Sequence, residues 1–165
     1  MITIGFADLL AGLYAGKIKD HGRLELQSYF SHFMDRAQYP SDGLDVLYEG
    51  LRHKIAHLGH PLVVFDTATK PKVFTGPRRR YGWTVYASER SSPIELVHYS
   101  APKLATKHTP PWDVSYDSRI KVSVSSLSKD LIASVFKHDG YYSRLESDPA
   151  ALSAFMKCME EFYPR

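Results

Sequence analysis

The sequence predicts an α+β protein that is mainly helical and carries one β insertion, on the strength of three observations. The chain has 165 residues, a length that fits one domain. Apolar residues recur at helical spacing in its first and last parts, whereas residues 62–99 contain short runs with a period of two. We therefore expect a single domain over 1–165. Its predicted parts are a helical core at about 4–59 and 125–163, a β insertion at about 62–99 and an irregular connection at 101–117.

Composition and charge narrow the class of protein. Hydrophobic residues make up 44% and charged residues 24% of the chain, which excludes a disordered protein. Lys and Arg number 21 against 18 Asp and Glu, and the resulting charge of +3 permits nucleic-acid binding without requiring it. Cys158 is the single cysteine, so no intramolecular disulfide can form. With no apolar run long enough to span a membrane and no basic start to a secretory signal, we expect a cytoplasmic protein with no membrane contact.

Two helices are predicted before Pro40. The first is expected to end at Gly16, because glycine readily adopts the left-handed conformation that follows a helix. The second is predicted over 24–36, and Pro40 marks a turn after it. The apolar residues that define the two helices are Phe6, Leu9, Leu10, Leu13, Tyr14, Leu24, Leu26, Tyr29, Phe30 and Phe33.

The third helix has the clearest pattern in the chain. Ser41 or Asp42 can cap its start by accepting a hydrogen bond from a free N–H of the first turn. Gly59 followed by Pro61 ends it. Its single apolar stripe consists of Leu44, Leu47, Leu51, Ile55 and Leu58.

The β insertion is predicted as a small antiparallel meander. Glycine, proline and charged clusters separate its short runs, which lie at 62–65, 73–75, 83–86 and 94–99. Ile120, Val122 and Val124 alternate with polar residues and predict one further short strand.

The last part of the chain predicts two more helices. Ser125 or Ser126 can cap the first, and a turn at Asp139-Gly140 ends it. For the second, Ser147 or Asp148 precedes Pro149, which is the favoured order at a helix start. Because helices supply most of the apolar stripes, we expect a helical bundle that carries the small antiparallel sheet.

A short motif near the end of the third helix points to a specific chemistry. Arg52 is followed at once by His53 and, after three more residues, by His57. This pattern resembles the signature of the HEPN (higher eukaryote and prokaryote nucleotide-binding) superfamily, in which an Arg and a His are four to six residues apart and a polar residue follows the Arg. The resemblance covers the helical parts of the chain, so the β region counts as an insertion.

The resemblance implies a HEPN-like helical bundle, often dimeric, whose active members cleave RNA without a metal or another cofactor. In that role His57 is the general base or acid, Arg52 holds the phosphate and His53 orients the substrate. Tyr48, one turn earlier, and Lys54 are then expected to contact the substrate. In a regular helix Arg52 and His57 lie about 140° apart around the axis, so they converge only through the long reach of Arg52, a local distortion of the helix or a second chain. A homodimer is expected, because two-fold symmetry brings His57 of one copy near Arg52 of the other.

A basic segment follows the motif. Arg78, Arg79 and Arg80 are consecutive, with Lys70 and Lys72 shortly before them and Tyr81 and Trp83 after them. Arginines beside aromatic rings can hold phosphates and stack bases, so this segment is a second candidate for RNA contact. The alternative is a solvated hairpin tip whose charges prevent edge-to-edge pairing.

Two alternatives to catalysis stay open. Arg52 could simply pair with Glu49, and the charge of His57 could simply favour the helix C-terminus. The chain would then be a non-catalytic HEPN-like interaction module that binds a partner protein through the β insertion. No metal site is expected, because the helix is predicted to end before His60 can join His53 and His57.

Overall fold

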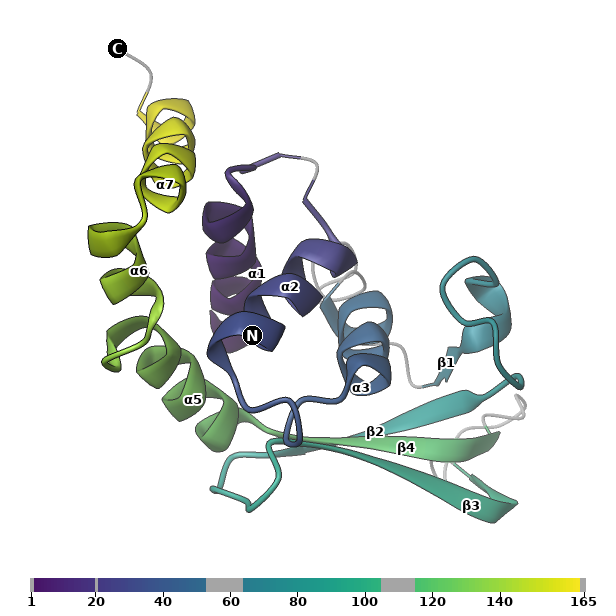
Figure 1. Ribbon diagram of the computed structural model, residues 1–165. Helices are drawn as coiled ribbons and strands as arrows, with labels where there is room; N and C mark the ends of the chain where they lie inside the picture. The colour runs from purple at the N-terminus through teal and green to yellow at the C-terminus, as the bar shows by residue number, and fades with distance from the viewer. Residues whose placement is uncertain (1, 20, 53–63, 105–114, 164–165) are drawn as a thin grey trace.

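Helices and strands form two layers in the computed structural model, which describes residues 2–19, 21–52, 64–104 and 115–163. The described helices all lie on one side of a four-stranded sheet, and none of them lies on its other face (Figure 1). The α+β class predicted from the sequence is confirmed.

The first two helices agree with the sequence pattern. Helix α1 spans Ile2–Ala15, and Gly16 ends it at a φ of 68°, the left-handed conformation that glycine tolerates. Helix α2 spans Arg23–Phe33, three residues short of the predicted end, because Met34 is already extended. The buried face of α2 consists of Leu26, Tyr29, Phe30 and Phe33.

The third helix starts as predicted but changes its winding. Helix α3 spans Ser41–Val46 and continues as a π-helical turn, η1, over Leu47–Arg52. The N-cap is Pro40, so the predicted caps Ser41 and Asp42 are wrong: both residues lie inside the first turn. The rest of the predicted helix, residues 53–59, lies outside the described residues.

The sheet is mixed rather than the expected antiparallel meander. Its strands are β1 (Phe65–Asp66), β2 (Arg80–Tyr86), β3 (Ile94–Leu104) and β4 (Ser115–Ser123), in the order β1-β2-β4-β3. Strand β4 lies between β2 and β3, parallel to the first and antiparallel to the second. An inner strand buries alternate residues, which explains why β4 carries a longer apolar alternation than the sequence analysis assigned to it.

The boundaries of the predicted β region are corrected as well. Strands β3 and β4 both extend into residues 101–117, which were expected to be irregular. The run at 73–75 forms no strand, since a 3-10 turn, η2 (Thr67–Thr69), and further turns follow β1 directly.

The hydrophobic core lies between the helices and one face of the sheet, here called the covered face. Its fully buried side chains include Ile120 on β4, whose burial contributes about 1.5–3 kcal/mol. The covered face is formed by Tyr81, Trp83, Ile94, Leu96, Ile120 and Val122.

Helix α3 and η1 cross the covered face from β3 to β1. A Cβ at Gly43 would lie 3.1 Å from Ile94 on β3, and one at Gly50 would lie 2.6 Å from the Trp83 ring and 3.1 Å from Phe65. Both glycines therefore allow the helix backbone to approach the strands more closely than a side chain would.

The C-terminal helices form an arm beside α1 (Figure 1). Helix α5 (Val124–Phe136) is capped by Ser123 instead of Ser125 or Ser126, α6 (Tyr141–Ser147) was not predicted, and α7 (Pro149–Phe162) is capped by Asp148 as predicted. The Cys158 thiol is buried against the Gly12 carbonyl oxygen of α1. The helices share one core with the sheet, an arrangement that supports the α+β class but not a HEPN-like bundle.

Candidate nucleic-acid interface

The described part of the Arg-x4-His motif begins in the π turn. Turns of this kind are rare inside helices and are frequent at functional sites. Arg52 is the last residue of η1. Tyr48, expected to contact substrate, is only 8% exposed, and its hydroxyl lies 3.5 Å from the position that a Cβ would take at Gly22. The structure thus places Tyr48 in the packing against the start of α2.

The other predicted motif residues lie outside the described residues. These are His53, Lys54 and His57, so their roles remain predictions. The structure describes the backbone position of Arg52, at the end of η1.

An ion pair joins the motif helix to the basic segment. The carboxylate of Glu49, itself 8% exposed, lies 2.9 Å from the Lys70 Nζ. Lys70 follows η2, at the beginning of the basic segment. The Glu49 carboxylate, which the sequence offered as a partner for Arg52, is therefore engaged by Lys70.

Close packing provides a second link between the same two regions. Gly50, two residues before Arg52, lies against Trp83 of β2 and Phe65 of β1. Because the basic segment runs from the end of β1 into the start of β2, η1 and the basic segment belong to one corner of the fold.

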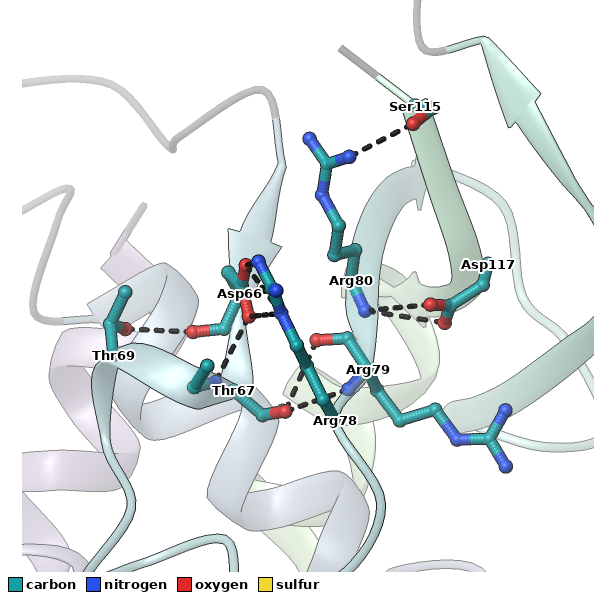
Figure 2. A network of polar contacts seen from close by, with 9 residues as sticks. Asp66, Thr67, Thr69, Arg78, Arg79, Arg80, Ser115 and Asp117 are labelled. Carbon is teal, nitrogen blue, oxygen red and sulfur yellow. Dashed lines mark hydrogen bonds and ion pairs between the residues drawn. The ribbon is translucent and has the colours of Figure 1, made fainter. Parts of the chain in front are cut away.

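The three consecutive arginines have different surroundings (Figure 2). Arg78 is the most exposed of the three, and its guanidinium binds both carboxylate oxygens of Asp66. This hydrogen-bonded contact lowers the pKa of the Asp66 carboxyl. The charge of Arg78 is therefore already balanced within the protein.

Arg80 is held by β4. Its guanidinium donates to the Ser115 hydroxyl at 2.9 Å, and its backbone N–H donates to the Asp117 carboxylate at 3.2 and 3.3 Å. These contacts fix the start of β2 against β4, so Arg80 has a structural role whatever else it does.

Arg79 differs from both neighbours. Its backbone pairs with Thr67: the Thr67 N–H and hydroxyl both donate to the Arg79 carbonyl oxygen, and the Arg79 N–H donates to the Thr67 hydroxyl. Its guanidinium points away from this network in Figure 2 and makes no hydrogen bond or ion pair with any residue that the structure describes. Of the three predicted arginines, Arg79 is thus the one available to a phosphate.

The sequence analysis overlooked a group of cations and aromatic rings on the uncovered face of the sheet. Arg119 and Lys121 lie on β4, and Tyr99 and Lys103 lie on β3. The signal was present in the polar residues that alternate with Ser118, Ile120 and Val122. It was missed because these residues come together only when β3 pairs with β4, and the sequence analysis did not predict that pairing.

Metal and membrane sites were sought among the described residues only. In that part of the chain no three His, Cys, Asp or Glu side chains are arranged to hold a metal ion. Over the same residues, no helix combines the length and the apolar character that a bilayer span requires. A hollow of about 530 Å³ lies between α2 and α3, and Arg36 is its charged lining residue.

Comparisons with protein-family models, with curated proteins and with solved structures found no match to this chain. The functional argument therefore rests on its own residues and on the resemblance of the Arg-x4-His motif.

Proposed function

We propose that the protein binds RNA where η1 meets β1 and β2, and that it cleaves the RNA without a metal through Arg52 and His57. The proposal keeps the HEPN-like chemistry that the motif implies, and it places this chemistry in an α+β fold.

The observation that carries the proposal is the junction of the motif helix with the basic segment. The Glu49–Lys70 ion pair and the contact of Gly50 with Trp83 hold the two regions together. The backbone of Arg52 thus ends η1 at the same corner as the Arg79 guanidinium, which has no hydrogen-bond or ion-pair partner among the described residues. A phosphate bound there would meet two arginines, which are the side chains best suited to it.

The chemistry is an internal transesterification. A base removes the proton of the 2′-hydroxyl, the 2′-oxygen forms a bond to the adjacent phosphorus, and the bond from phosphorus to the 5′-oxygen breaks. An acid returns a proton to that 5′-oxygen. His57 suits these proton transfers because imidazole titrates near neutral pH. Arg52 would stabilise the charge that develops on the phosphorane, with His53 orienting the substrate and Lys54 holding a flanking phosphate.

A homodimer remains part of this proposal. The angular separation of Arg52 and His57 expected for a regular helix favours a site shared by two copies. Measuring the mass in solution by light scattering tests it, and a monomer at micromolar concentration would argue against a shared site.

The second candidate is a non-catalytic interaction module, and the exposed apolar side chains of the C-terminal arm favour it. On α5, Ile132 is 57% and Phe136 73% exposed, an unusual position for large apolar residues on adjacent turns. A partner protein or a second copy would bury them.

The deciding experiment is cleavage of single-stranded RNA in excess EDTA. The wild-type protein is compared with Arg52→Ala, His57→Ala and the matched control Arg78→Ala, whose charge is already balanced by Asp66. We expect His57→Ala to lose about 100-fold or more in rate, Arg52→Ala to lose a similar factor, and Arg78→Ala to stay near wild type. Equal cleavage by all four proteins would refute the assigned site, and no cleavage by any would favour the interaction module.

A further inference from the structure

The face of the sheet without helices carries a defined set of side chains. Ile120 and Val122 of β4 point into the core, so Arg119 and Lys121, which alternate with them, point to the opposite face of the sheet. Their register partners are Gly82 and Thr84 on β2, and Val97 and Glu95 on β3. We call this surface the open face; register or contact with these residues adds Tyr86, Arg90, Tyr99, Lys103, Tyr116, Asp117 and Arg80.

Cations and tyrosine rings alternate along one half of the open face. The Arg119 guanidinium lies 4.9 Å from the centre of the Tyr116 ring, the Tyr116 and Tyr99 rings are 6.0 Å apart, and the Lys103 Nζ lies 5.7 Å from the Tyr99 ring. A Cβ at Gly82 would lie 3.0 Å from the Tyr116 ring, so the glycine allows this ring to pack closely on the backbone of β2.

The other half repeats the combination of a cation and a ring. The exposed Arg90 guanidinium stacks 4.0 Å above the Tyr86 ring. Beside it the Lys121 Nζ binds Glu95 at 3.2 Å. Between Arg90 and Lys121 lies a hollow of about 120 Å³ that Tyr86, Ser91, Ser92, Glu95 and Ser123 also line, so two cations and one carboxylate border it.

The charge of the open face suits a polyanion. It holds five cationic side chains against the two carboxylates of Glu95 and Asp117, an excess equal to the +3 of the whole chain. The Asp117 carboxylate already accepts hydrogen bonds from the Arg80 N–H and the Ser118 hydroxyl. The surface thus combines a positive field with planar groups, the two requirements for binding single-stranded nucleic acid.

We infer that the open face is a platform for single-stranded RNA. Bases stack on Tyr99 and on the outer plane of the Arg90 guanidinium, while Arg119, Lys121 and Lys103 contact phosphates. The inference rests on the proposed function in that RNA is the partner. It adds a second surface, on the opposite side of the sheet from α3 and η1, that holds the strand whose cleavage Arg52 and His57 perform (Figure 1).

The test measures binding to a fluorescent 2′-O-methyl oligouridine of about twelve nucleotides by anisotropy. This probe has no free 2′-hydroxyl, so binding is separated from cleavage. The Arg119→Gln/Lys121→Gln double variant is expected to reduce the slope of log K against log salt by about 1.4, or roughly 20-fold in affinity at about 0.1 M salt. Tyr99→Ala is expected to weaken binding by about five-fold or more.

Two further variants sharpen the test. Glu95→Gln removes an acidic group from the open face and is expected to strengthen binding. Lys157→Gln removes one positive charge from α7, which packs on α1 and α6, and is expected to bind like wild type. Thermal unfolding of every variant controls for loss of fold.

Binding of the folded double variant as tight as that of wild type and Lys157→Gln would overturn the open-face inference. So would an absence of probe binding by the wild-type protein. The EDTA cleavage assay reports on the proposed function separately. Cleavage that depends on His57, together with unchanged binding by the double variant, would support the proposed function and refute the open-face platform. Binding through the open face without any cleavage would support the platform and refute the proposed cleavage.

Discussion

The two faces of the sheet are built from alternate residues of the same strands, yet they serve different purposes. On the covered face, apolar side chains such as Ile120 are buried, and glycines bring α3 and η1 close. On the open face, cations lie over tyrosine rings and alternate residues stay partly exposed. The contrast teaches that stability is concentrated on one face, which leaves the other free to be selected for binding.

The largest expected effect on stability comes from removing a large apolar side chain that packs at the covered face. Phe65 is fully buried under η1, so Phe65→Ala is expected to lower the free energy of unfolding by about 3–5 kcal/mol. On the open face, Glu95→Ala should stay within about 0.5 kcal/mol of wild type. Urea denaturation measures both; similar losses in the two variants would mean that the faces do not differ as described.

A smaller effect is expected where the helix backbone approaches the sheet. Gly50→Ala places a Cβ 2.6 Å from two ring carbons of Trp83, so the ring or the helix must shift. We expect a loss of about 1–3 kcal/mol in urea denaturation. The matched control is Gly76→Ala, where nothing lies within 4 Å of the added Cβ. If the two alanine variants are equally stable, η1 does not need the close approach.

The smallest expected effect concerns the edge between the faces, at the Asp66–Arg78 pair. Arg78 lowers the pKa of Asp66 below 3.8, so the folded state binds this proton more weakly than the unfolded state. The stabilisation is therefore present above pH 3.8 and is lost as the pH falls through the lowered pKa. Asp66→Asn should be less stable than wild type at neutral pH, and this difference should shrink below pH 3.8.

Denaturation of the two proteins across this pH range tests the prediction. The difference should also vanish when both carry Arg78→Gln, since the pair is then absent from each. A difference that persists well below pH 3.8 would show that the ion pair with Arg78 is not its source.

Local signals predicted the parts of the fold that depend on neighbouring residues. Gly16 ends α1 and Asp148 with Pro149 starts α7, because both features act within one turn of backbone. Local signals did not predict the features that depend on contacts between distant segments of the chain. The parallel pairing of β2 with β4 joins residues more than thirty positions apart, and no turn pattern encodes it.

The candidate site shows the same division. The spacing between Arg52 and His57 and the run of three arginines were visible in the sequence, but Arg78, Arg79 and Arg80 looked equivalent there. Only the fold separates them, because Asp66 and Ser115 come from other strands. The open face was missed for a related reason, since Tyr99 and Tyr116 meet only when β3 and β4 pair.

The strand order also sets when the sheet can assemble. Each of the two long strands β2 and β3 pairs along its length with β4, the last strand in the chain. A growing polypeptide therefore carries two strands without their main partner until Ser123 has left the ribosome. The sheet beyond its short β1–β2 pair and the surface on its far side are completed only in that late step, and a chain shortened before Ser115 would lack both.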